Sequence, residues 1–209
     1  SLDYFKHLGV SSLWLNPVLE NDMPSYSYHG YAMTDLYAVD PRYGSNELYK
    51  ELADKAKEKG IGLIMDQVAN HIGSSHPWMA DLPSEDWVNQ WPEFTQTNHM
   101  KVSRFDPHAA DVDRKMFTDG WFVETMPDLN QRNEKLARYL IQNSIWWIEY
   151  LGLHGIRMDT WPYPEKQFLA DWTKAILDEY PNFNIVGEEW VSDPALISYW
   201  QAGTAKMDN

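Results

Sequence analysis

The chain has 209 residues, of which 44% are hydrophobic, so it is long enough and apolar enough to bury a core. Its formal net charge of −14 excludes a typical nucleic-acid-binding protein, because affinity for a phosphate backbone rests on Lys and Arg. The lack of cysteine excludes disulfides, zinc–thiolate sites and thiol nucleophiles, but it is compatible with any redox compartment.

Nothing in the sequence indicates a membrane span, since no apolar run approaches the roughly 20 residues that cross a bilayer. The first residues, SLDYFKHLGV, lack the features of a signal peptide, but the chain begins inside an element and an export signal could precede it. We therefore leave the localisation open, with a periplasmic, secreted or cell-surface protein favoured over a cytoplasmic one. The sequence does not indicate which oligomeric state the protein adopts.

The first predicted elements are a strand, a helix and a second strand. Residues 10–16 (VSSLWLN) predict the first strand, and Ser45 is typical of the N-cap of a helix. The apolar run at 61–68 (IGLIMDQV) is too short for a helix and predicts a strand buried on both faces of a parallel sheet. Three residues of the helix share its predicted buried face: Leu48, Leu52 and Ala56.

The same alternation continues toward the C-terminus. In chain order the pattern predicts a helix over 133–151 that ends at Gly152, a strand at 155–161, a helix over 164–180, a strand at 184–190 and a helix from Asp193. Short apolar strands separated by helices of more than about ten residues indicate βαβ crossovers and a parallel sheet.

A segment of some 60 residues, rich in Trp, Pro, Asp and His, interrupts the alternation of strands and helices and is too long for an ordinary loop. We expect a barrel segment at 1–71, an inserted small domain at 72–131 and a second barrel segment at 132–209. A closed (β/α)8 barrel needs eight strands and about 250 residues. The α/β pattern therefore predicts about the first half of a TIM barrel, truncated at both ends.

Polar side chains follow three predicted strands, at the edge where functional residues of α/β sheets collect. A carboxylate at the end of an apolar strand is costly to bury unless it is paired or used, so structural ion pairing stays the alternative for any single one. The clusters are Asp66, Asn70 and His71, then Arg157 and Asp159, then Glu188 and Glu189.

Two of these acids suit two different tasks. Arg157 and Asp159 are two residues apart on a strand and share a face, so we expect Arg157 to lower the pKa of Asp159 and keep it ionised, as a nucleophile requires. A general acid requires a drier neighbourhood, and Glu188 follows Ile, Val and Gly. Glycoside hydrolysis uses such a pair of carboxyl groups, and the configuration is retained when the two carboxyl groups are about 5 to 5.5 Å apart.

Six motifs occur in the order typical of one family: the chain resembles the alpha-amylase superfamily of retaining glycosidases over essentially its whole length. Three are similar to its conserved regions, DQVANH (66–71), GIRMDTW (155–161) and GEEW (187–190). The supporting stretches are LGVSSLWLNPV, YHGYAMTDLYAVDPRYGS and MPDLN. The MPDLN stretch resembles the neopullulanase and cyclomaltodextrinase branch more than typical endo-amylases.

The resemblance implies a role for each catalytic residue. Asp159 would be the nucleophile, Glu188 the general acid/base, and Arg157 the cation that orients Asp159. The inserted segment would be domain B, which lies between the third barrel strand and the third helix. The implied reaction is cleavage of α-1,4-glucosidic bonds in malto-oligosaccharides, cyclodextrins, pullulan or starch, and it requires no cofactor.

Five further residues receive roles from the same resemblance. His71 would donate a hydrogen bond to the sugar in the cleaved subsite, Tyr31 would form the aromatic platform beneath that sugar, and His29 would bind substrate at the cleft entrance. Asp66 and Asn70 would support the site structurally.

The sequence departs from the family pattern at three points. The third essential carboxylate and its neighbouring His belong to a later strand, so we expect this chain alone to be inactive. Asp159 is followed by Thr-Trp-Pro-Tyr-Pro and not by the usual Lys-His, which weakens the case for long-chain starch. Where typical members bind calcium, Asn70 remains but Asn130 and Tyr163 replace an Asp and a His, so we predict no metal there.

Two other classes of protein remain as alternatives. A metal-dependent barrel hydrolase needs several His or acidic residues that converge on one ion, whereas the cleft motifs offer only His71 and His29. A non-catalytic α-glucan-binding or scaffold protein with an amylase-like barrel is expected to have lost a carboxylate, and here both are present with Arg157.

Overall fold

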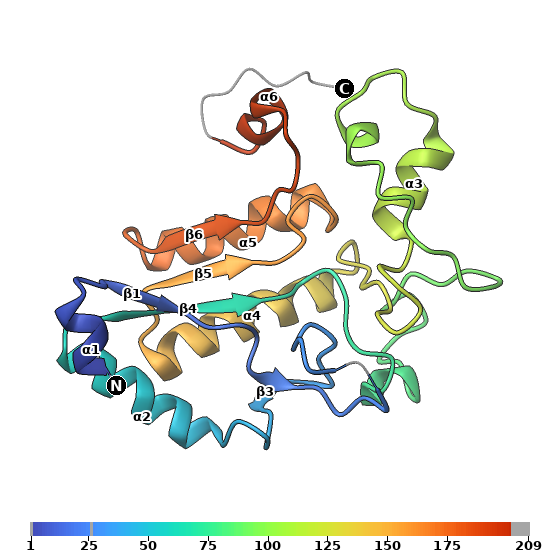
Figure 1. Cartoon of the computed structure of the whole chain (residues 1–209). Helices are drawn as coiled ribbons and strands as arrows, with labels where there is room; N and C mark the ends of the chain where they lie inside the picture. The colour runs from blue at the N-terminus through green and yellow to red at the C-terminus, as the bar shows by residue number, and fades with distance from the viewer. Residues whose placement is uncertain (1, 26, 202–209) are drawn as a thin grey trace.

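A four-stranded parallel sheet with strand order β1–β4–β5–β6 forms the centre of the computed structural model, which describes residues 2–25 and 27–201. Its strands are β1 (Ser12–Trp14), β4 (Gly62–Gln67), β5 (Gly155–Met158) and β6 (Asn184–Gly187). All four arrows point toward the same edge (Figure 1). Gln67 pairs with Met158 and Met158 with Gly187, so these three strands end level and bring the residues that follow them together.

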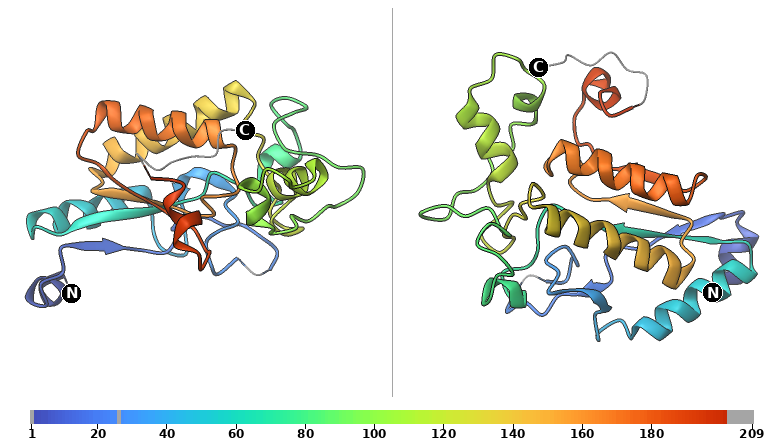
Figure 2. Two further views of the ribbon diagram at one scale, coloured as in Figure 1. Left: turned by 90° about the horizontal axis from the view of Figure 1, so that it is seen from above. Right: turned by 180° about the vertical axis from the view of Figure 1, so that it is seen from behind.

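Three helices connect the strands and form a layer: α2 (Asn46–Glu58), α4 (Glu134–Leu151) and α5 (Lys166–Glu179). Seen from behind, α4 and α5 lie across one face of the sheet (Figure 2). The predicted caps are confirmed, since the Ser45 side chain accepts from the amide of Leu48 and Gly152 ends α4 with φ 64°. The predicted α/β fold, part of a (β/α) barrel, is confirmed.

The predicted buried face of α2 was partly wrong. Tyr49, Ala53 and Ala56 are its buried residues, whereas Leu48 is 56% exposed. The ring of Tyr49 packs toward Trp147 of α4, with 6.2 Å between centroids. This contact with a large, fully buried indole turns the face that begins at Tyr49 toward the core.

Several short elements had no sequence signal. They are α1 (Leu2–His7), an antiparallel pair of β2 (Leu19–Glu20) with β3 (Asp35–Val39), the 3₁₀ helices η1 (Pro77–Met79) and η2 (Lys101–Arg104), and α3 (Asp111–Asp119). The predicted last helix is α6 (Pro194–Ser198). Within the described ranges no helix is long and apolar enough to cross a membrane.

The long segment between β4 and α4 lies beyond the carboxyl ends of the strands (Figure 1). It contains η1, η2 and α3 and contributes no strand to the main sheet, and every residue of it is described. It meets the end of β4 through bridges such as His71 with Asp128. The segment is therefore placed beside the residues that follow β4, β5 and β6.

Candidate active site

The guanidinium of Arg157 on β5 is the centre of a cluster of three carboxylates. Its Nη1 donates to Asp66 Oδ1 at 2.9 Å and to Asp159 Oδ1 at 2.8 Å, and its Nη2 lies 2.5 Å from Glu188 Oε1. Asp66 is opposite Arg157 in the ladder of β4 and β5, which explains this contact. The sequence predicted the pair with Asp159, but it carried no signal that one arginine joins all three strand ends.

Asp66 is the innermost of the three acids, with a fully buried side chain. Its Oδ2 accepts from Trp14 Nε1 at 3.0 Å and from Tyr31 Oη at 3.1 Å. Burial raises its pKa, and the bonds from Arg157, Trp14 and Tyr31 oppose this change. Asp66 therefore anchors other side chains and is out of reach of a ligand in the cleft.

The electrostatic expectation for Asp159 was wrong. Burial, together with the negative charge of Glu188, raises the pKa of Asp159 to about 7, although Arg157 acts in the opposite direction. The side chain is 9% exposed, and the single guanidinium is shared with two other carboxylates. Desolvation therefore outweighs the partner that the sequence identified.

Glu188 follows β6 and is held by the backbone of the neighbouring loop. Its Oε2 accepts from the amide of Thr160 at 2.9 Å. The side chain of Glu188 is 23% exposed and that of Asp159 is 9% exposed, and β6 is the edge strand of the described sheet. The dry surroundings expected of Glu188 stay a prediction.

Thr160 is a residue of the site that the sequence analysis missed. It has φ 48°, in the left-handed region that a β-branched residue rarely adopts. This conformation directs its amide to Glu188 Oε2 immediately after Asp159. The hydroxyl Oγ1 is buried and has no hydrogen-bond partner among the described residues.

The structure brings the predicted sugar-binding residues together at the ends of β4 and the β2–β3 region. His71 is buried, its Nε2 lies 3.1 Å from the carbonyl of Tyr31, and burial lowers its pKa to about 4, so the ring is neutral. The rings of Tyr31 and His29 stack with 6.0 Å between centroids. Asn70 lies beside His71, 3.3 Å from Nδ1. Their contact with substrate stays a prediction.

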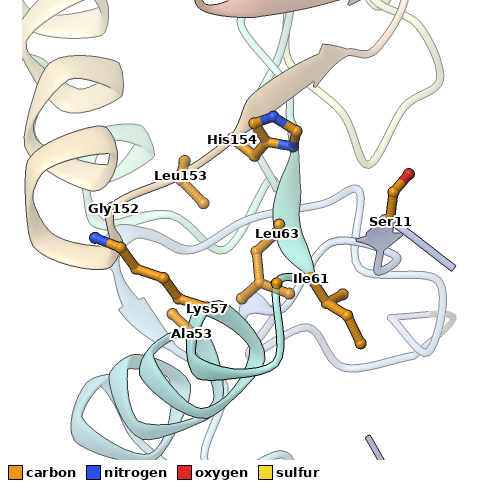
Figure 3. Close-up of a pocket in the computed structure, with 10 residues that line it drawn as sticks. Ser11, Ala53, Lys57, Ile61, Leu63, Gly152, Leu153 and His154 are labelled. Atoms are coloured by element: carbon orange, nitrogen blue, oxygen red, sulfur yellow. The ribbon is translucent and has the colours of Figure 1, made fainter. Parts of the chain in front are cut away.

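Two cavities lie beside the main sheet. One of about 610 Å³ runs along β6, where Asn184, Gly187 and Thr173 of α5 line it in part. The other, of about 330 Å³, opens at the amino ends of the strands, where Lys57 and His154 line it (Figure 3). Neither cavity is lined by Arg157, Asp159 or Glu188.

The calcium positions of the family do not fit a metal in this chain. Asn70 Oδ1 and Asn130 Oδ1 are buried and lack hydrogen-bond partners among the described residues, but the third position is Tyr163, whose hydroxyl is 3.0 Å from His99 Nδ1. None of the three supplies the carboxylate that a hard dication favours. Residues 2–25 and 27–201 contain no group of three or more His, Asp or Glu that could hold an ion.

Comparison with known proteins agrees with this geometry. The family description "Alpha amylase, catalytic domain" matches residues 1–208. The chain is 33% identical to Alpha-amylase 3 of Dictyoglomus thermophilum over 96% of its own length and 40% of that protein. It is 30% identical to a cyclomaltodextrinase of Thermoanaerobacter pseudethanolicus, over 90% of the chain and 31% of the relative.

Solved structures give the same assignment. The α-amylase of Geobacillus thermoleovorans, crystallised with acarbose, is 35% identical with a TM-score of 0.78, covering 94% of this chain and 40% of that one. An Anoxybacillus α-amylase is 29% identical with a TM-score of 0.81 and the same coverage. The chain thus spans about two fifths of the length of these relatives. It belongs to the alpha-amylase family, within the catalytic domain.

Proposed function

We propose that the longer protein containing this chain is a retaining glycosidase that cleaves α-1,4-glucosidic bonds in malto-oligosaccharides, cyclodextrins, pullulan or starch. The observation that carries the proposal is the bridge that Arg157 makes between the carboxylates of Asp159 and Glu188. One guanidinium keeps two carboxylates near each other, and retention requires a separation of about 5 to 5.5 Å. Relatives named alpha-amylase and cyclomaltodextrinase support the same substrate class.

In the proposed reaction Asp159 attacks the anomeric carbon while Glu188 protonates the glycosidic oxygen. A covalent glycosyl–Asp159 ester forms and the shortened glucan leaves. Glu188, now ionised, takes a proton from water, and the resulting hydroxide displaces Asp159 and restores the original anomeric configuration. Because the negative charge of Glu188 raises the pKa of Asp159, protonation of Glu188 removes that charge and favours the ionised Asp159 that the first step requires.

Product analysis of the full-length protein tests this function. We expect it to cleave at least one of maltoheptaose, β-cyclodextrin and pullulan, and NMR of the first products should show the α-anomer. Glu188→Gln should lower kcat by about 10²- to 10⁴-fold because it removes general acid catalysis, and Asp159→Asn should lower it at least as much. Glu149→Gln on α4, away from the strand ends, is the matched control and should keep wild-type turnover.

The outcomes separate the competing functions. Wild-type turnover by Asp159→Asn on every substrate would refute the nucleophile and with it the mechanism. A wild-type protein that binds these glucans and leaves them intact would favour the non-catalytic scaffold. We further propose that residues 1–209 alone are inactive, so the assays use the full-length enzyme.

A further inference from the structure

The 3₁₀ helix η2 of the long segment lies against the two loops that carry the catalytic pair. Arg104 Nη2 donates to the carbonyls of Tyr163 at 3.1 Å and Pro164 at 2.9 Å, in the loop after β5. Lys101 Nζ donates to the carbonyl of Trp190 at 2.7 Å, in the loop after β6. One short turn is thus bonded to both loops.

Lys101 reaches the second loop with an almost buried side chain, 15% exposed. Its Nζ lies 3.8 Å from Glu189 Oε1 and 5.9 Å from the centre of the Tyr163 ring. Burial lowers the pKa of Lys101, while the negative charges of Glu189 and Glu188 oppose that change. Ordering a long lysine side chain costs rotamer entropy, so these contacts have to offset that cost.

The segment that Lys101 contacts is the loop directly after Glu188. Among the described residues, no backbone hydrogen bond is made by residues 189–192 to another strand of the main sheet. The ladder with the loop after β5 ends at Glu188, whose amide and carbonyl bond to Met158 and Trp161. Within the described part of the chain, side-chain bonds hold the backbone just beyond Glu188, namely Lys101 on the carbonyl of Trp190 and Trp200 on the carboxylate of Glu189.

We propose that Lys101 is a positioning residue for the acid/base: by holding the carbonyl of Trp190 and facing Glu189, it fixes the segment that presents Glu188 to the glycosidic oxygen. The inference rests on the proposed function. It makes the inserted segment part of the catalytic geometry, because the contact crosses from η2 to the end of β6. Displacement of a catalytic group by about 1 Å is enough to slow a reaction by as much as 10²-fold.

The test compares lysine variants of the full-length protein. Lys101→Gln should lower kcat on maltoheptaose about tenfold or more, with KM within about twofold, because alignment and not ground-state binding is lost. Lys101→Arg should restore most of the rate, because it also donates to a carbonyl. Lys115→Gln removes the same charge from the same segment, where Lys115 lies over the Trp91 ring, and should behave as wild type.

Two measurements guard against a merely structural effect. Lys101→Met keeps the apolar stem and should show the same kcat loss with a nearly unchanged melting temperature. Amide hydrogen exchange of residues 188–192 should become faster in Lys101→Gln and stay unchanged in Lys115→Gln.

Wild-type kcat and exchange in Lys101→Gln and Lys101→Met would overturn the inference, and so would an equal kcat loss in Lys115→Gln. An inactive wild-type protein would instead refute the proposed function. In that case faster exchange confined to the Lys101 variants would still establish that Lys101 holds this segment.

Discussion

The indole of Trp161 lies so close to the backbone of Gly187 that a Cβ at position 187 would be 2.5 Å from its Cγ. Gly187 is the last residue of β6 and directly precedes Glu188, and the amide of Trp161 donates to the carbonyl of Glu188 at 3.2 Å. The ring thus packs against the end of β6, near Trp172 of α5 and Trp200. The absence of a side chain at 187 leaves room for the indole next to the residue that precedes Glu188.

The first prediction concerns this contact. Gly187→Ala should lower the free energy of unfolding by about 1 to 3 kcal/mol through overpacking, and it should also lower kcat because relief of the clash moves Glu188. Gly152→Ala is the control: φ is 64° there, and nothing lies within 4 Å of an added Cβ. It should cost about 1 kcal/mol of stability from backbone strain, measured by urea unfolding, and leave kcat unchanged. Equal kcat values for Gly187→Ala and wild type would contradict the prediction.

A second prediction follows from the orphan hydroxyl of Thr160. Thr160→Val should leave the free energy of unfolding unchanged or raise it by about 1 kcal/mol, because Oγ1 is buried and lacks a partner among the described residues. Thr97→Val is the matched control, since Thr97 Oγ1 donates to the carbonyl of Phe117 at 3.0 Å, and it should lose about 1 to 2 kcal/mol. Denaturant unfolding of both variants measures the difference, and a larger loss at 160 than at 97 would refute it.

The sequence predicted the elements that have strong hydrophobic periodicity and residues typical of helix ends. The four strands of the main sheet, the Ser45 cap and the Gly152 end of α4 follow from short apolar runs between helices, from a side-chain cap and from a left-handed glycine. The short pair β2–β3 has a two-residue strand, too short for any pattern to appear. Element type was therefore predictable where a whole run of residues shared one environment.

The candidate site shows a different limit. The residue types at the strand ends were predictable, because an acid after an apolar strand is costly without a use. The sign of the pKa change at Asp159 was not, since it depends on how many carboxylates share Arg157 and on how much water each keeps. Thr160 acts on Glu188 through its backbone amide, which every residue but proline has. No residue type could signal that contact.

The raised pKa of Asp159 makes a prediction about stability and pH. Its pKa rises from 3.8 to about 7 on folding, so the folded state binds the proton more tightly, and this contribution to stability is present below pH 3.8 and lost as the pH rises through about 7. Asp159→Asn removes the group. The variant should therefore gain melting temperature relative to wild type at about pH 8 and gain much less at about pH 5. A pH-independent difference between the two melting temperatures would show that Asp159 titrates alike in the folded and unfolded states.

The last prediction tests whether one planar cation has to serve three carboxylates. Arg157→Lys keeps the charge, but a single ammonium cannot reach Asp66, Asp159 and Glu188 from one position as the two Nη atoms do. With carboxylates left unpaired in the interior, stability should fall by about 3 kcal/mol, and kcat/KM of the full-length protein should fall by about 10²-fold or more.

Arg42→Lys is the matched control. Arg42 also donates to one carboxylate through two nitrogens, from Nε to Asp40 Oδ1 at 2.8 Å and from Nη2 to Asp40 Oδ2 at 2.6 Å. This pair lies outside the catalytic cluster. The Arg42→Lys substitution should lower the melting temperature and leave the kcat of the folded protein unchanged. If Arg157→Lys lost stability without losing kcat, the guanidinium would hold the barrel together without aligning the catalytic pair.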